Sequence, residues 1–379
     1  MTTPSNEPHR SKPLERGALA PCERIPRRPT TIRGLTPPAR ECEAHSRRAF
    51  LTTTASLAAG LWAAPRLCAD EKSPQPALIA ITLDLEMSRQ YPTKDQTHWD
   101  YQKGNLNAET KAYSVEAARR VKAHGGVLHF FAVGQVFEQE NIDWMTQIAA
   151  AGHPIGNHTY DHVYVLATKP EDIQFRFKRS PWLLEGKTTA EVIEENIRLC
   201  TTAMKIRTGK TPAGFRTPGG FNTGLNGRED IQQMLLDQNF SWVSSVYPAH
   251  KSDFQDGKVS EEVFANIVEA QELSQPFVYP SGLIEVPMSP ISDVGAFRSA
   301  GWDLPAFLEA IRRGVTWAIE QGAVFDFLAH PSCLYVTDPE FKTIELICDL
   351  VQQAGDRARI VDLGTIAKRA EHNASAKRR

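Results

Sequence analysis

Short apolar runs alternate with amphipathic segments along most of the chain, between Ala77 and Leu363. The apolar runs are nearly continuous and rich in Ile, Leu, Val and Phe, which is typical of strands buried on both faces of a parallel sheet. This pattern predicts strands at residues 77–85, 127–133, 153–158, 213–216, 241–245, 283–287, 324–329 and 359–363.

The segments between these runs repeat their apolar residues at helical spacing, and several of them end at glycine. The segment 188–208, for example, begins at Thr188 or Thr189, carries acidic residues in its first turns and ends at Gly209. The pattern predicts helices at 114–124, 141–151, 188–208, 229–238, 304–321 and 341–354. Strands that alternate with helices imply a parallel sheet. About seven such units within about 300 residues predict one barrel-like α/β domain over residues 77–370, followed by a disordered tail over 371–379.

Two long stretches, 88–113 and 163–187, interrupt the alternation. Long irregular stretches in a compact domain are usually functional or mobile loops. Both leave from the end of the predicted barrel at which active sites are built. Their aromatic residues, Trp99, Tyr101 and Trp182, either stack on sugar rings or pack the loops down, and the sequence does not decide between these two interpretations.

The N-terminal region differs from the rest in composition. Residues 1–45 are rich in Pro, Arg and small polar residues, which predicts a disordered extension. Residues 46–69 place Arg47-Arg48 before a short apolar stretch, and this resembles a twin-arginine signal peptide. The alternative is an ordinary buried helix. We expect residues 70–76 to be a linker and the chain to be exported, periplasmic or secreted, after transient contact with the Tat machinery.

Charge and composition exclude several classes of protein. Residues 1–69 carry 11 basic and 5 acidic side chains, which leaves 32 basic and 40 acidic side chains for the body. An acidic body argues against nucleic acid as a partner. No segment reaches the roughly 18 apolar residues of a stable membrane span. Cys200, Cys333 and Cys348 are odd in number and widely spaced, so we expect buried thiols rather than a disulfide framework.

Side chains able to do chemistry gather where predicted strands end. His158 and His162 have the i, i+4 spacing that places two imidazoles on one face of a helical turn. Two such imidazoles can share a metal ion, which needs a third protein ligand and an open position to be catalytic. Asp84 and Glu86 end the first strand and alternate along it, so both point to the same face. Carboxylates directly after a buried run are costly unless they have a use.

Two further strand ends add an arginine and a histidine. Arg216 ends the strand 213–216 and can pair with Asp84, holding that carboxylate ionised. Pro218 and the two glycines after it let the backbone pass close to a ligand. His330 ends the strand 324–329, and its pKa near neutrality suits a general acid.

The order of these strand ends resembles the polysaccharide deacetylase family, also called the NodB-homology family or carbohydrate esterase family four. The resemblance runs from about Ala77 to about Ala367. It implies a distorted (β/α) barrel of about seven parallel strands. It also implies metal-dependent removal of N-acetyl groups from a glycan such as peptidoglycan, a chitin oligomer or an exopolysaccharide. One divalent ion, most simply Zn²⁺, would activate the attacking water.

The resemblance assigns a role to each motif residue. Asp84 is expected to be the general base and Arg216 to orient it. His330 is expected to protonate the leaving amine. Gly219 is expected to offer its backbone N–H to the oxyanion and, with Pro218, to contact the substrate.

The expected metal ligands are His158, His162 and Glu86. The family's usual second aspartate is replaced by Leu85, which cannot coordinate a metal. Glu86 lies one position later, on the same face as Asp84, and matches family branches with an Asp-x-Glu spacing. The replacement keeps two alternatives open: hydrolysis of a non-sugar amide on the same fold, and a glycan-binding protein without catalysis.

The fourth family motif is an aspartate that supports the catalytic histidine or arginine. Asp293 is our first choice for it and Asp303 the second. We also expect Trp302, beside Asp303, to contact the substrate.

Overall fold

The computed structural model describes residues 75–86 and 103–377. The predicted extension 1–45 and signal peptide 46–69 lie outside the described residues, as do the first five residues of the linker. Trp99 and Tyr101 also lie outside them. The described residues belong to one compact unit, Cys68–Arg379.

The centre of this unit is a nine-stranded sheet in the order β6-β7-β5-β4-β3-β2-β1-β8, with β9 paired to β1. Neighbouring strands are parallel except β6 and β7. The sheet is therefore a mostly parallel, curled half-barrel, which confirms the predicted fold class with more strands than expected. The strands are β1 (Ala77–Leu85), β2 (Leu128–Ala132), β3 (Ile155–Asn157), β4 (Phe215–Phe221), β5 (Trp242–Val246), β6 (Phe277–Val278), β7 (Ile284–Glu285), β8 (Val324–Ala329) and β9 (Ala358–Ile360).

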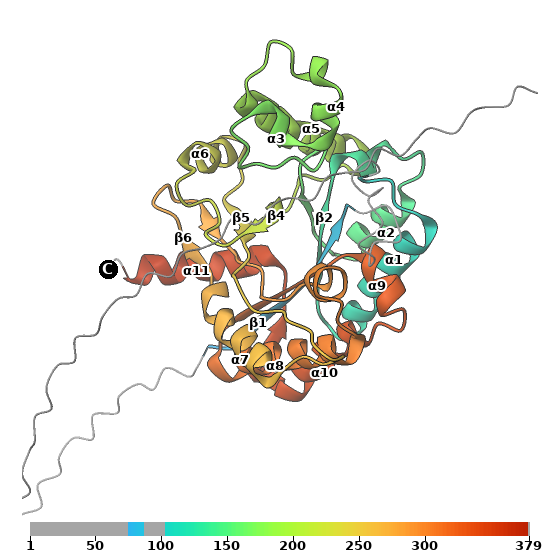
Figure 1. Ribbon diagram of the computed structural model, residues 1–379, viewed down its shortest axis with the longest axis vertical. Coiled ribbons are helices and arrows are strands. Elements are labelled where there is room, and N and C mark those ends of the chain that lie inside the picture. The colour runs from blue at the N-terminus through green and yellow to red at the C-terminus, as the bar shows by residue number, and fades with distance from the viewer. Residues whose placement is uncertain (1–74, 87–102, 378–379) are drawn as a thin grey trace, which may run out of the picture. The chain divides into compact units, whose positions relative to one another are not determined.

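Helices surround the sheet, as Figure 1 shows. They are α1 (Ala108–Ala123), α2 (Asp143–Ala150), α3 (Pro170–Ile173), α4 (Phe175–Arg179), α5 (Thr189–Thr208), α6 (Glu229–Asp237), α7 (Glu261–Ala270), α8 (Leu304–Gln321), α9 (Pro331–Thr337), α10 (Lys342–Ala354) and α11 (Leu363–Lys377). The α5 helix begins with a capping box between Thr188 and Glu191 and ends at Gly209 in the left-handed conformation, as its sequence predicts.

The alternation of side chains along β1 determines where polar residues gather inside the half-barrel. Alternate residues from Ala77 to Leu85 point outward and pack with α1, α8 and α10 in the largest apolar cluster. On the other face, Leu78 and Ala80 belong to an apolar cluster with Trp242. Thr82, Asp84 and Glu86 continue that inner face and are polar. The interior of the half-barrel is thus apolar at one end of β1 and polar at its carboxyl end.

Several elements differ from the predictions. The tail predicted to be disordered from residue 371 is instead the last part of α11, which runs to Lys377. Ile366 and Ala367 anchor this helix in the core, and no Gly or Pro follows Gly364 to end it. The stretch 163–187, predicted to be irregular, contains the short helices α3 and α4.

The structure also describes the long helices and three of the cysteines. No described helix is both long and apolar enough to cross a membrane. Cys200, Cys333 and Cys348 are buried and carry free thiols, as expected.

Candidate active site

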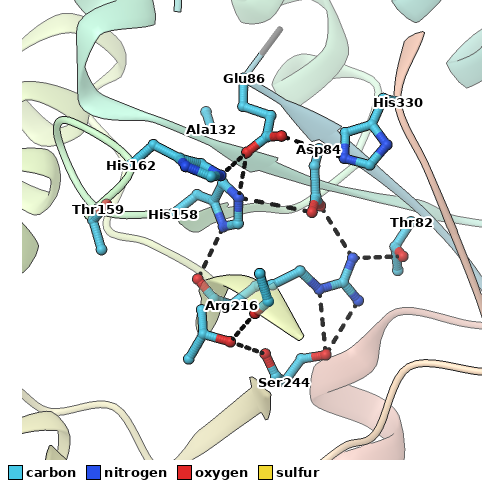
Figure 2. Close-up of polar contacts among 12 residues, drawn as sticks. Thr82, Asp84, Glu86, Ala132, His158, Thr159, His162, Arg216, Ser244 and His330 are labelled. Carbon is cyan, nitrogen blue, oxygen red and sulfur yellow. Dashed lines mark hydrogen bonds and ion pairs between the residues drawn. The ribbon is translucent and has the colours of Figure 1, made fainter. Parts of the chain in front are cut away.

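The predicted strand-end residues meet around one cavity of about 250 Å³. Its lining combines the end of β1, the turn after β3, the bulged part of β4 and the residue after β8. Figure 2 shows the polar groups of this region pointing toward one another. The cavity lining includes Asp84, Glu86, His158, His162, Gly219 and His330.

Glu86, His158 and His162 form a cluster able to hold a metal ion, with one ligand atom from each residue lying within 4.8 Å of the others. Glu86 Oε2 lies 3.0 Å from His158 Nε2 and also contacts His162 Nε2. The two imidazole rings have centroids 5.0 Å apart (Figure 2). The structure therefore brings together the three predicted metal ligands.

The hydrogen bonds of the histidines suit metal binding. His158 Nδ1 lies 2.9 Å from the carbonyl oxygen of Arg216. Because a carbonyl only accepts, Nδ1 must carry a proton, and this bond directs Nε2 toward Glu86, where it could ligate a metal ion. Burial lowers the pKa of His162 to about 4, so this imidazole is neutral at pH 7. Two imidazoles and one carboxylate are a donor set that fits zinc and related divalent ions.

The backbone that carries the two histidines is not the helical turn that their spacing suggested. Residues 158–162 form an irregular turn, in which Thr159 and His162 both have a φ of 58°. Asn157 Oδ1 accepts a hydrogen bond from the Thr159 N–H at 2.8 Å, and Thr159 Oγ1 accepts one from the Val163 N–H at 2.9 Å. A left-handed non-glycine residue is strained and needs such support.

Lys103 is a site residue that the sequence did not indicate. Its ammonium lies 3.0 Å from Glu86 Oε1 and 3.4 Å from His162 Nε2, and the residue is only 3% exposed. Burial alone would raise the pKa of Glu86, but His162 and Lys103 hold it well below its usual range. Glu86 is therefore an ionised carboxylate before any metal binds. A single lysine in an irregular stretch gives no sequence signal of this role.

Asp84 and Arg216 form the predicted ion pair, with Arg216 Nη1 3.1 Å from Asp84 Oδ1. Arg216 is fully buried, and Asp84 is 4% exposed. A second carboxylate, Asp326, lies 2.5 Å from Arg216 Nη2. We did not predict a role for Asp326 from the sequence, because it lies inside an apolar strand. Burying a lone aspartate in such a strand costs free energy, and this feature of the sequence could have indicated that Asp326 has a role.

His330 pairs with Asp293, the first choice for the fourth motif. Asp293 Oδ1 lies 2.9 Å from His330 Nδ1, and Asp293 Oδ2 accepts a hydrogen bond from the His330 backbone N–H at 2.7 Å. Burial opposes protonation of His330, but the Asp293 carboxylate outweighs it and raises the pKa of His330 to about 10. Asp303, the second choice, instead caps α8 by accepting a hydrogen bond from the Ala306 N–H.

Two predicted substrate contacts do not line the cavity. Trp302 is 4% exposed and packs in the core against Phe264, with its indole N–H donating to the Ser252 carbonyl oxygen at 2.9 Å. Burial of the large indole ring in the core places Trp302 away from the cavity, so the prediction that it contacts the substrate was wrong. Pro218 is also buried and outside the cavity lining.

Gly219 does line the cavity, with a φ of +80° that favours glycine. It lies where β4 and β5 shift register between Arg216 and Phe221. The neighbouring Gly220 is tightly packed, since a Cβ atom there would lie 2.3 Å from Tyr247 Cβ. Apolar side chains from other elements complete the lining: Tyr247, Met288, Val294 and Leu328.

Comparison with known proteins agrees with the site. Residues 100–229, which include His158, His162 and Arg216, match the family model of polysaccharide deacetylases. No curated protein sequence matches the chain.

Solved structures share the fold at low sequence identity. A protein from Mycobacterium smegmatis described as a polysaccharide deacetylase is 15% identical, with a TM-score of 0.54 over 80% of this chain and 93% of its own. One from Pseudomonas aeruginosa PAO1 with a similar description is 13% identical, with a TM-score of 0.50 over 77% and 89%. The Puue allantoinase is 13% identical, with a TM-score of 0.51 over 80% and 92%. The family match indicates a hydrolase with a polysaccharide deacetylase domain over residues 100–229, and the solved structures show that the described chain shares the fold.

Proposed function

We propose that this hydrolase removes acetyl groups from an N-acetylated glycan and that it depends on one divalent metal ion, with Zn²⁺ as the best fit. The observation that carries the proposal is the meeting of three functions in one cavity. A carboxylate base, a protonated histidine and a three-residue metal cluster all line it. A protein that only binds glycans needs no such base and acid.

Glu86, His158 and His162 would hold the ion. When bound, a divalent ion polarises an acyl oxygen and makes water more acidic. The donor set fits this role, because the two imidazoles are oriented by their surroundings and the carboxylate is ionised. Among the described residues, this is the one cluster of His, Cys, Asp and Glu side chains close enough to hold an ion.

Asp84 takes the proton of the attacking water. It is 4% exposed, and the Arg216 guanidinium, 3.1 Å from its Oδ1, orients the carboxylate at the cavity. The Gly219 backbone N–H then stabilises the oxyanion that forms on the acetamide.

His330 delivers the proton that lets the amine leave. Its raised pKa keeps it an imidazolium at neutral pH, with Nδ1 bound to Asp293 and Nε2 at the cavity, 3.5 Å from Glu86 Oε1. Water adds its hydroxyl to the acetyl carbon, the carbon–nitrogen bond breaks, and acetate and a free amine are released.

The substrate is proposed to lie outside the cytoplasm: peptidoglycan, a chitin oligomer or an exopolysaccharide. The arginine pair and the apolar stretch within residues 46–69 support export through the Tat machinery. Trp182 lies in the stretch 163–187 after β3 and is 65% exposed, so it offers an aromatic surface for a sugar ring.

A second candidate is hydrolysis of a non-sugar amide. Leu85 occupies the position of the family's metal-binding aspartate, and its side chain lies in the apolar core at 1% exposure. The proposed metal ligands therefore depart from the family's usual set, and this departure favours a substrate other than an N-acetylated sugar.

Acetate release tests both candidates. Purified chain is incubated with N-acetylglucosamine oligomers, peptidoglycan and a set of small amides, with and without a chelator, followed by addition of zinc. We expect acetate from a glycan, its loss with chelator and its return with zinc. The Asp84→Asn variant should be inactive with normal metal content. Activity that survives complete metal removal refutes metal dependence, and activity on small amides alone favours the second candidate.

A further inference from the structure

A closed ring of polar groups lies beneath the cavity, inside the half-barrel. Its centre is Arg216, whose guanidinium contacts Asp84 at 3.1 Å, Asp326 at 2.5 Å and Thr82 Oγ1 at 2.8 Å. Ser244 Oγ accepts from the same guanidinium at 3.2 Å and 3.3 Å, as Figure 2 shows. Every donor direction of this arginine is thus engaged within the protein.

Asp326 is the most completely buried member of this ring, with no exposed surface. Besides Arg216, its side chain accepts a hydrogen bond from Thr82 Oγ1 at 2.8 Å. Its backbone N–H donates to Ser289 Oγ at 2.9 Å. Asp326 therefore holds the arginine from β8, while Asp84 holds it from β1.

The ring holds two carboxylates for one guanidinium. Asp84 alone would neutralise Arg216, and burying a second carboxylate costs free energy. Burial raises the pKa of Asp326 to about 6 despite the neighbouring arginine, which reflects that cost. A carboxylate kept at such a cost points to a use beyond neutralising the arginine.

The geometry indicates what this use is. Arg216 belongs to β4 and Asp326 to β8, two strands separated by β3, β2 and β1 in the sheet. Their ion pair therefore crosses the interior of the half-barrel. Asp326 also lies four residues before His330 on the same chain segment. The face of the guanidinium packs over Phe131, 4.4 Å from the ring centroid, which fixes its plane.

We propose that Asp326 is a positioning residue: it anchors Arg216 against Asp84 and ties the strand of the base to the strand of the acid. The inference rests on the proposed function for its catalytic consequence, but the anchoring itself does not. Asp326 does not line the cavity and contacts none of the proposed metal ligands in the hydrogen bonds described here.

Asp326→Asn keeps the shape of the side chain and removes its charge. We expect kcat for acetate release to fall about tenfold to a hundredfold, the effect of a small displacement of catalytic groups. KM and the metal bound per chain should stay unchanged, because the cavity and its ligands are intact. A kcat within twofold of wild type, or a change in KM alone, overturns the proposal.

Asp338→Asn is the matched control. Asp338 is also fully buried, but it caps α10 by accepting hydrogen bonds from the Lys342 and Thr343 N–H groups and does not line the cavity. This variant should melt at a lower temperature without a selective loss of kcat. An equal loss of kcat in both variants assigns Asp326 a merely structural role and overturns the proposal.

A melting experiment tests the anchor without any substrate. Asp326→Asn is made in wild type and in Arg216→Met, with Arg216→Lys as the second background if the first does not fold. If Asp326 anchors Arg216, the aspartate change lowers the melting temperature less in the arginine variant than in wild type. Equal losses in both backgrounds overturn the proposal. If wild type releases no acetate from any glycan, the proposed function fails, and this comparison still decides the anchor.

Discussion

Replacing Asp293 with asparagine should abolish the unusual basicity of His330. His330 makes two contacts with this one side chain: its imidazole Nδ1 lies 2.9 Å from Asp293 Oδ1, and its backbone N–H donates to Asp293 Oδ2 at 2.7 Å. Asparagine preserves the shape and most of the hydrogen bonding but removes the negative charge. The imidazolium then keeps its desolvation cost and loses its main compensation.

The size of the effect follows from the pKa of His330, about 10 in the native protein. The ordinary value is about 6.5, so the shift corresponds to roughly 5 kcal/mol favouring the charged form. Burial lowers the pKa and Glu86, whose Oε1 lies 3.5 Å from Nε2, raises it, so losing Asp293 should bring the pKa of His330 down toward its ordinary value. Because the native pKa is raised, the stabilisation is fully present below about pH 6.5 and is lost as pH rises through about 10.

The titration is measured by NMR on the imidazole of His330, with the metal-free protein and with the zinc-loaded protein. Asp303→Asn is the control, because Asp303 caps α8 and has no contact with His330 in the described structure. We expect the Asp293→Asn protein to titrate near neutrality and to lose about tenfold to a hundredfold in kcat at pH 8. Thermal melts should differ from wild type most below pH 6.5 and least near pH 10.

An unchanged His330 titration in Asp293→Asn would contradict this expectation, because it would mean that another group stabilises the imidazolium. A shift of the same size in Asp303→Asn would refute it as well, since it would point to a general effect of removing an acid.

Three other changes have definite expected results. Glu86→Ala should reduce zinc affinity by roughly 100-fold or more in equilibrium dialysis, since it removes the only carboxylate of the proposed ligand set, and unchanged metal content would remove Glu86 from the site. Lys103→Met should tighten zinc binding in the same assay, because it removes an ammonium 3.0 Å from Glu86 Oε1, whereas weaker binding would show that the ammonium supports the site. Gly220→Ala should raise KM and lower the melting temperature, because the added Cβ would lie 2.3 Å from Tyr247 Cβ. Unaltered kinetics would show that Tyr247 can move aside without affecting substrate binding.

The parts of the site that could be read from the sequence are those fixed by strand geometry. Asp84 and Glu86 share a face because side chains alternate along β1, and the carboxyl ends of parallel strands meet at one edge of a sheet. His330 follows β8 directly, so its position near that edge followed from the strand alone. The spacing of His158 and His162 indicated the right pair, although the turn that joins them is irregular rather than helical.

The parts that could not be read depend on tertiary packing. Lys103 reaches Glu86 from a stretch without periodicity, and no local pattern records where such a stretch returns. The role of Asp326 was not recognised, because apolar residues flank it on both sides in β8. Trp302 was expected at the substrate because it is aromatic and adjoins a candidate motif, but burial of its ring against Phe264 determined its place.

We propose that this hydrolase works through one metal ion held by Glu86, His158 and His162. The most direct test titrates zinc into metal-free chain while bound metal and acetate release from N-acetylglucosamine oligomers are followed together. We expect no activity without metal and a linear rise to a plateau at one ion per chain, with no such rise in His158→Ala. Full activity in the metal-free chain, or activity that does not track bound metal, would contradict it.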